Sequence, residues 1–262
     1  MNVLQNLVEL YDQLPPGSTY KDVAGCILEH LEEVADATIY DVAELTHSSR
    51  TTVWRMVQKM GYENYSDFHH ALRQAVSHYT YYNRILRSDA CSNADSVLSA
   101  YSQQLKNIRT MMDKHITGAM LDAMADQVHA ADEIVFFFPY RTFAIASFQQ
   151  NLSMSGKKTD YLCLLPEMLE RSRHLSPQSI VFMDTIDHAE AMDMLNVFDT
   201  AKAAGARIIK TIRGRAPYDR YVDQTIFTFD MMENVPTNIL LTISYFLMLS
   251  EVYRKKFIKE IL

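Results

Sequence analysis

The chain has 262 residues, which is long for one domain and sufficient for two domains, each with its own hydrophobic core. Its apolar fraction of 48% and charged fraction of 22% are those of a globular protein and exclude a disordered or fibrous chain. The net charge of -7 excludes a protein that coats nucleic acid through a broad basic surface, so any contact with DNA must be local.

Cysteine usage and hydropathy indicate a cytoplasmic protein without membrane contact. Cys26, Cys91 and Cys163 lie far apart without a CxxC pair, which is typical of a reducing compartment and offers no zinc-ligand spacing. The N-terminal segment combines acids with an amphipathic pattern, which predicts a helix rather than an export signal. The most apolar stretch, 239–249, is interrupted by polar residues and is too short to cross a bilayer.

The first part of the chain has the periodicity of helices. Apolar residues recur every three or four positions from Val3 to about Gly61, which predicts an all-helical domain. A later stretch rich in Ser, Asn and Asp is typical of a connection between domains. We therefore expect a first domain at 1–83, a linker at 84–96 and a second domain at 97–262.

In the second domain, apolar runs of strand length alternate with helical patterns. The predicted strands are 133–138, 159–165, 179–183, 207–212 and 225–229, and the helices between them are 142–155, 167–173 and 189–204. Two further helices, 95–115 and 117–130, precede the first strand, and a last helix extends from about Pro236 to Lys256. Such alternation implies a parallel sheet covered on both faces. The second domain is thus predicted to be a doubly wound α/β fold.

Residues 38–62 are predicted to form two helices joined by a tight turn. Thr38 can cap the first helix, and His47 lies in the turn, where a glycine with positive φ is common. Ser49 can cap the second helix. The apolar stripe that packs this helix onto the first consists of Val53, Met56, Val57 and Met60.

The opposite face of this second helix is polar and basic within an acidic chain. It carries Arg50, Thr51, Thr52, Arg55, Gln58 and Lys59. Hydroxyl and N–H groups at a helix start suit phosphate oxygens, while Arg50, Thr51 and Arg55 can reach base edges in the major groove. Two interpretations remain: DNA recognition by Ser49, Arg50, Thr51, Thr52, Arg55 and Lys59, or an ordinary solvated basic face. Trp54, at the edge of the stripe, is predicted to be a partly buried core residue.

These residues resemble the RpiR-type regulators, which join an N-terminal helix-turn-helix to a C-terminal sugar isomerase (SIS) domain. The matching positions are Ser49, Thr52, Arg55, Lys59, Met60, Gly61, Tyr62, Tyr65 and Phe68, followed in the second domain by Ala201, Lys202, Gly205 and Ala206. The family usually has glycine at the position of Asn64. The resemblance implies a sequence-specific transcription regulator of carbohydrate metabolism, whose SIS-like domain senses a sugar phosphate and dimerises.

The sequence departs from the family in both loops that hold the phosphate. The glycine-rich turn after the first strand is replaced by FFFPYRTF, and the Ser/Thr loop after the third strand by MDTIDHAEA, in which Asp187 and Glu190 oppose phosphate binding. One interpretation is a different ligand, bound at the carboxyl ends of the strands. Its predicted contacts are Arg141, Thr142, Thr185 and His188. The other interpretation is a vestigial pocket in a domain that only dimerises.

No residue pattern indicates catalysis, a metal site or a cofactor. An SIS-type isomerase needs an acid and a base beside an intact phosphate loop, and the histidines lack metal-ligand spacing. An isomerase and a dimerising interaction protein remain the alternatives to a regulator. The last helix is apolar on most sides, which favours core or a subunit interface. We therefore expect a homodimer, or a higher homo-oligomer, that binds a palindromic double-stranded DNA operator.

Overall fold

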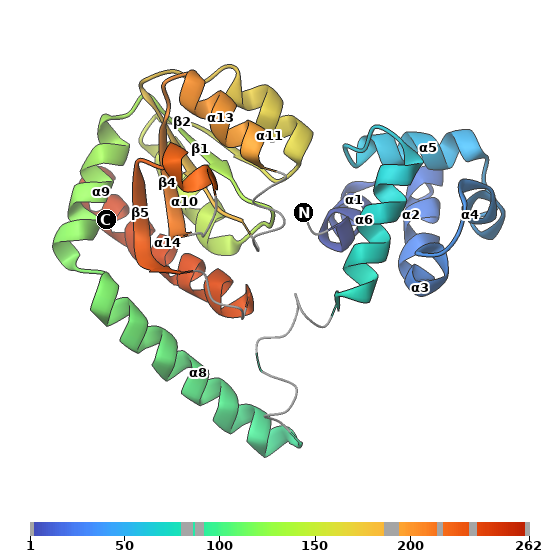
Figure 1. Ribbon diagram of the computed structural model, residues 1–262, viewed down its shortest axis with the longest axis horizontal. Coiled ribbons are helices and arrows are strands. Elements are labelled where there is room, and N and C mark those ends of the chain that lie inside the picture. The colour runs from blue at the N-terminus through green and yellow to red at the C-terminus, as the bar shows by residue number, and fades with distance from the viewer. Residues whose placement is uncertain are drawn as a thin grey trace. The chain divides into compact units, whose positions relative to one another are not determined.

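The computed structural model describes residues 3–79, 86, 92–185, 194–213, 217–230 and 235–259. The chain divides into two compact units, Met1–Tyr81 and Tyr82–Leu262. The first unit is helical and the second is α/β (Figure 1), which confirms the fold class predicted from the sequence.

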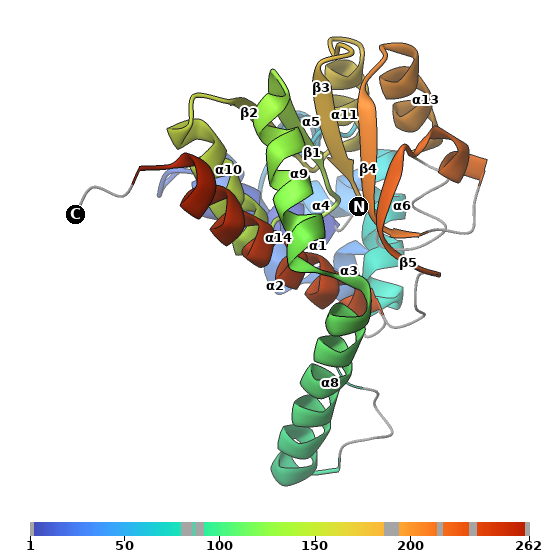
Figure 2. The same cartoon turned by 90° about the vertical axis from the view of Figure 1, so that its left-hand side faces the viewer.

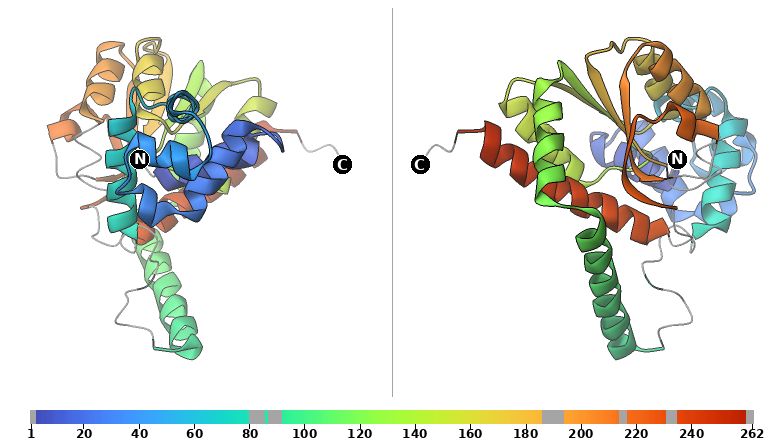
Figure 3. Two further views of the ribbon diagram at one scale, coloured as in Figure 1. Left: turned by 90° about the vertical axis from the view of Figure 1, so that its right-hand side faces the viewer. Right: turned by 60° about the vertical axis from the view of Figure 1, so that its left-hand side comes forward.

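The N-terminal unit packs its helices around a single apolar core (Figure 3, left). Its helices are α1 (Val3–Gln13), α2 (Thr19–Glu29), α3 (Leu31–Val34), α4 (Ile39–Leu45), α5 (Arg50–Lys59) and α6 (Tyr65–Ser77). Leu7, Ile27, Val53 and Phe68 are fully buried in this core. The three-and-four spacing of apolar residues thus brings one face of each helix to a common centre.

The second unit is built on a five-stranded sheet, all of whose paired strands are parallel. The strands are β1 (Glu133–Phe137), β2 (Lys158–Leu162), β3 (Ser179–Met183), β4 (Arg207–Arg213) and β5 (Gln224–Asp230), in the order β2-β1-β3-β4-β5. The strand order reverses between β1 and β3, because β2 lies on one side of β1 and β3 on the other. The carboxyl ends of β1 and β3 therefore flank the switch point at which open α/β sheets place ligands.

Helices cover both faces of this sheet (Figure 2). They are α8 (Ala94–His115), α9 (Gly118–Ala130), α10 (Phe143–Met154), α11 (Leu165–Ser172), α13 (Leu195–Ala203), the 3-10 helix η2 (Pro217–Tyr221) and α14 (Val235–Phe257). Phe136 packs with α9, α10 and α14, whereas Val135 and Phe137 pack with α11 and α13. Successive residues of a strand point to opposite faces, so β1 is apolar on both sides.

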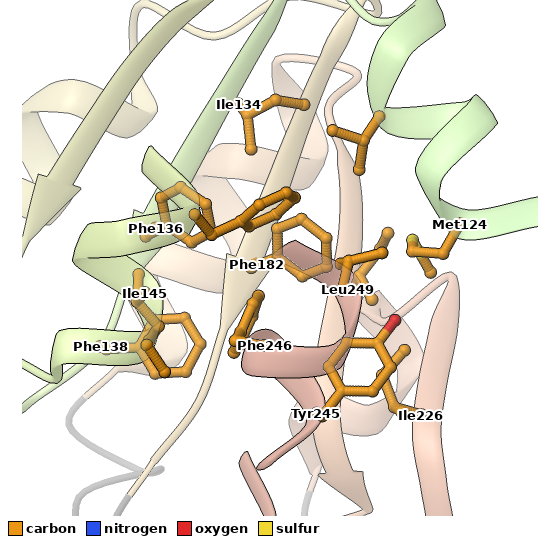
Figure 4. Packing of buried hydrophobic residues seen from close by; sticks show 14 of the residues in the cluster. Met124, Ile134, Phe136, Phe138, Ile145, Phe182, Ile226, Tyr245, Phe246 and Leu249 are labelled. Atoms are coloured by element: carbon orange, nitrogen blue, oxygen red, sulfur yellow. The ribbon is translucent and has the colours of Figure 1, made fainter. Parts of the chain in front are cut away.

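An aromatic cluster joins α14 to the sheet (Figure 4). The ring centroid of Phe246 lies 5.8 Å from that of Phe136, 5.7 Å from Phe138, 6.1 Å from Phe148 and 5.3 Å from Phe182. This packing accounts for the strongly apolar sequence of α14 as core. Within the described parts of the chain, α14 included, no helix has the length and apolar character needed to span a membrane.

We predict that Phe246→Ala lowers the free energy of unfolding by about 3–5 kcal/mol, because it leaves a cavity among four aromatic rings. Phe143→Ala is the matched control, since 81% of the Phe143 side chain is exposed, and it should change stability by less than about 0.5 kcal/mol. Chemical denaturation of both variants measures the difference. Equal effects would contradict the central place of Phe246 in the core.

Candidate DNA-binding surface and effector site

Helix α4 is fixed by hydrogen bonds at both of its ends. Thr38 begins α4 with a capping box: its backbone N–H donates to Asp41 Oδ2 over 2.8 Å, and its hydroxyl accepts from Asp41 N–H. After α4, Ser48 N–H donates to Ala43 O over 2.8 Å, and His47 adopts a φ of 47°. This is the left-handed residue of a helix C-cap, as expected for His47 from the sequence.

Helix α5 is anchored by its cap and its apolar stripe. Ser49 Oγ accepts a hydrogen bond of 3.1 Å from Thr52 N–H and lies 2.9 Å from the Thr52 hydroxyl. Val53, Met56 and Val57 are fully buried. Helix α5 contacts α2, α4 and α6 in the core of the unit, so the remaining side of the helix faces solvent.

The solvent side of α5 carries the residues predicted to contact DNA. Ser49, Arg50, Thr51, Arg55 and Lys59 are exposed and Thr52 is half-buried, so one helix brings all six together. The Arg50 guanidinium lies 4.5 Å from the ring centroid of Tyr40, and Lys59 Nζ lies 5.2 Å from that of Tyr20. The side chain of Arg55 makes no hydrogen bond or ion pair with any described residue. Arg50 and Lys59 are thus held by aromatic rings, whereas Arg55 is available to a ligand.

At the carboxyl end of β1, Arg141 and Thr142 lie against a tyrosine of β2. Thr142 N–H donates to Tyr161 Oη over 3.0 Å, and Thr142 Oγ1 accepts from Ile145 N–H as the N-cap of α10. The Arg141 guanidinium carbon lies 5.1 Å from the Tyr161 ring centroid. Tyr161 Oη also donates to Tyr140 O over 2.7 Å, and burial raises the pKa of Tyr161. Tyr161 therefore fixes the loop that carries both predicted effector residues.

At the carboxyl end of β3, beside the middle of β4, an acidic and a basic side chain are buried together. Asp184 and Lys210 are almost completely excluded from solvent. Asp184 Oδ1 accepts from Thr185 N–H over 2.9 Å, and Oδ2 accepts from Thr242 Oγ1 over 3.0 Å. Lys210 Nζ donates to Tyr218 Oη over 3.3 Å and to Thr185 Oγ1 over 3.4 Å. Thr185, a predicted effector residue, thus lies between the two charged groups.

The charge state of this cluster follows from burial and from its partners. Burial raises the pKa of Asp184 above its usual value, and the positive charge of Lys210 and the hydrogen bonds from Thr185, Thr211 and Thr242 offset only part of this increase. Lys210 compensates the carboxylate that it is buried with, so these two side chains together offer little net charge to an incoming phosphate.

The remaining predicted effector residue, His188, lies outside the described residues, as do Asp187 and Glu190. The structure places Arg141 and Thr142 after the carboxyl end of β1. It places Thr185 after the carboxyl end of β3, beside Lys210 of β4. Among the residues that the structure describes, no group of His, Cys, Asp or Glu side chains is arranged to hold a metal ion.

Comparison with known families identifies the N-terminal unit. Residues 1–79 match the family model described as "Helix-turn-helix domain, rpiR family". This unit is a helix-turn-helix domain of the rpiR family. The match covers α1 to α6, and within it α4, the tight turn at His47 and α5 have the helix–turn–helix arrangement, with α5 as the second helix.

Solved structures similar to the chain include a NanR protein, a domain of a transcription factor and a putative sugar-phosphate isomerase. No curated protein matches the chain. The NanR protein of Vibrio vulnificus, solved with ManNAc-6P, is 17% identical, covers 98% of this chain and 93% of its own, and gives a TM-score of 0.48. The sugar isomerase domain of an RpiR transcription factor from Sphaerobacter thermophilus is 15% identical, with coverages of 60% and 96% and a TM-score of 0.39. A putative sugar-phosphate isomerase from Listeria monocytogenes is 12% identical, with coverages of 62% and 87% and a TM-score of 0.43.

Two aromatic residues of the rpiR-type domain lie where the sequence did not predict them. Trp54 was expected to be a partly buried core residue; it is 40% exposed and is not part of the apolar core of the unit. It follows Val53 by one residue, which rotates it about 100° away from Val53 to the margin of the buried stripe. Tyr40, 62% exposed beside Arg50, was not singled out, although an aromatic residue in the first turn of α4 is its sequence signal.

The rpiR-type residues beyond α5 stabilise the domain. Asn64, where the family usually has glycine, is the N-cap of α6: its Oδ1 accepts from Asp67 N–H over 2.9 Å. Its φ of -147° is extended and needs no glycine. Tyr65 Oη donates to Ala37 O over 2.9 Å, and burial raises the pKa of Tyr65 to about 12. These hydrogen bonds fix the start of α6 and join it to the segment that precedes α4.

The sequence analysis did not single out Asp184 and Lys210. Asp184 directly follows the apolar run of β3, and Lys210 interrupts the apolar run of β4. A charged residue inside a strand that is buried on both faces requires a partner of opposite charge or a hydrogen-bond partner. The position of Lys210 within an apolar run was therefore the sequence signal for a buried polar cluster. Which residue would be the partner depended on the alignment of β3 with β4, in which Met183 pairs with Lys210.

We predict that Asp184→Asn and Lys210→Met each lower the free energy of unfolding by about 3 kcal/mol, because each leaves one buried charge without compensation. The double variant should lose about 1–3 kcal/mol less than the sum of the single variants. Urea denaturation at neutral pH measures this double-mutant cycle. Lys158→Met, at an exposed position on β2, is the control for loss of a lysine. Additive single effects would contradict the coupling.

Proposed function

We propose that the chain is a sequence-specific, DNA-binding transcription regulator rather than an enzyme. The observation that carries this proposal is the solvent side of α5 in the rpiR-type helix-turn-helix domain. Helix α5 contains two arginines and a lysine and no acid, in a chain whose net charge is -7. The basic side chains thus concentrate at the position from which a recognition helix enters the major groove.

The residues of α5 divide into two roles. The first-turn N–H groups and the Ser49 and Thr51 hydroxyls suit phosphate oxygens at the positive end of the helix. Arg55, which lies one turn further and has no described partner, is placed to donate to base edges. Tyr40 stacks on Arg50 and limits its rotamers, so Arg50 loses less conformational freedom when it binds DNA.

The proposed regulator acts as a homodimer in the cytoplasm. Two copies related by a two-fold axis would present two α5 helices to a roughly palindromic operator. In this assignment, residues 1–83 bind DNA, 84–96 connect the domains, and 97–262 form the SIS-like domain for effector binding and dimerisation. Its target genes would belong to carbohydrate metabolism.

We predict that Arg55→Ala weakens operator binding by roughly 1–3 kcal/mol and relaxes sequence preference, because it removes a base contact. The operator can first be selected from genomic DNA with the unmodified protein, and binding is then measured by fluorescence anisotropy. Arg207→Ala is the matched control, because Arg207 is exposed at the start of β4 in the other unit. If Arg55→Ala binds like Arg207→Ala, α5 does not read DNA through Arg55.

The proposed effector site lies at the carboxyl ends of β1, β3 and β4. Arg141 there is exposed and can meet an anionic group, while Thr142 and Thr185 supply polar groups on either side of the switch point. The effector is a carbohydrate derivative, such as a sugar phosphate. Asp184 neutralises Lys210, so an anionic effector would depend on Arg141 for positive charge.

We predict that a sugar-phosphate effector raises the melting temperature of the protein, since a ligand at one hundred times its dissociation constant stabilises by about 2.7 kcal/mol. A thermal-shift panel of sugars and their phosphates identifies the ligand. Arg141→Ala should reduce this shift, whereas Arg207→Ala, at the amino end of β4 and thus at the opposite end of the strands, should preserve it. No shift with any member of the panel would favour the vestigial pocket.

A further inference from the structure

The N-terminal half of α8 extends beyond the sheet and the helices that cover it (Figures 1 and 2). The C-terminal half of the same helix is anchored: Ile108 is buried, and Met111 and Met112 pack against the core that includes α14. Helix α8 contacts α14 and β5. The two halves of one helix therefore meet different surroundings within the C-terminal unit.

The extended half of α8 carries an exposed apolar stripe. Leu98 is 66% exposed, Tyr101 37% and Leu105 45%. Their spacings of three and four residues continue through the buried Ile108, so the stripe is continuous with the hydrophobic core. This is the spacing of the contact positions of a coiled coil. A helix that only faced solvent would gain nothing from such a stripe.

The chemistry of this half-helix favours a copy of itself as the partner. Residues 96–105, SVLSAYSQQL, contain no charged side chain. Two such segments can approach without like-charge repulsion, and nothing on them attracts DNA or a charged peptide. Ser102, four residues after Leu98 and three before Leu105, lies beside the stripe, and its small side chain permits close approach of two helix axes.

We propose that the exposed half of α8 pairs in antiparallel orientation with the same segment of a second copy of this chain. An antiparallel pair is symmetric about a two-fold axis, as a closed dimer requires. In the register that uses the exposed stripe, Leu98 of one copy lies beside Tyr101 of the other, and Ala94 lies beside Leu105. Each hydrophobic core then extends along α8 into the interface.

This inference rests on the dimer of the proposed function and assigns its interface to α8. Helix α8 begins at Ala94, shortly after the helix-turn-helix unit ends. Pairing at this point joins two chains at a position close in sequence to their DNA-binding units, so the linker length would limit the distance between the two recognition helices. The spacing of operator half-sites would depend on this contact.

Sedimentation-velocity and equilibrium measurements on the full chain test the proposal. Leu98→Glu introduces a charge into the stripe of both copies, and we expect it to weaken dimerisation by about tenfold or more. Gln103→Glu is the matched control, because Gln103 is exposed on the opposite side of α8 and the variant adds the same charge. It should dimerise like the unmodified chain. Circular dichroism checks that both variants are folded.

Leu98→Ala removes apolar area without adding charge. If Leu98→Glu does not fold, the dimerisation of Leu98→Ala tests the proposal instead, and we expect it to be weakened. The proposal is overturned if both Leu98 variants dimerise as tightly as Gln103→Glu, because the dimer then uses another surface. It is also overturned if the unmodified chain is monomeric at all concentrations, as when its own N-terminal unit covers the stripe. Operator binding by the unmodified chain is measured separately, so loss of DNA binding and loss of the α8 contact are distinguishable.

Discussion

Burial of the parallel sheet on both faces is the constraint on which the second unit depends. Helices α9, α10 and α14 cover one face, and α11 and α13 cover the other, so strand residues are apolar in both directions. Polar groups that belong to the sheet therefore lie mainly at the ends of its strands. At the carboxyl end of β3, Asp184 and Thr185 meet Lys210 of β4, and the three satisfy one another through hydrogen bonds and opposite charge. The candidate effector site is a consequence of this arrangement.

The N-terminal unit is subject to a different constraint, because one side of α5 must be buried and the other must remain exposed to solvent. The left-handed backbone of His47, directly after the C-cap residue Thr46, and the N-cap at Ser49 fix the angle between α4 and α5. Val53, Met56 and Val57 then bury one side of α5 completely. With the backbone fixed in this way, the basic side chains on the other side are presented at defined positions before any ligand binds, which lowers the entropic cost of recognition.

Much of both units could be predicted from local patterns. The five apolar runs of the second unit correspond to β1–β5, and the cap residues Thr38 and Ser49 begin the helices that they were expected to begin. The site residues of α5 could be predicted because a helix brings residues together at fixed spacings. The Asp184–Lys210 cluster could not, since its members come from separate strands and from α14. Trp54 was misplaced because one residue along a helix separates core from solvent.

The sequence by itself determined the identity of the helices and strands, the alternation that forms a parallel sheet, and the basic face of α5. These features depend on hydrophobic periodicity and capping, which act over a few neighbouring residues. Only the tertiary structure decided that Tyr161 fixes the loop of Arg141, that Lys210 is buried with Asp184, and that half of the stripe on α8 remains exposed. Each of these depends on which distant segments pack together, and packing depends on strand order and helix placement rather than on local spacing.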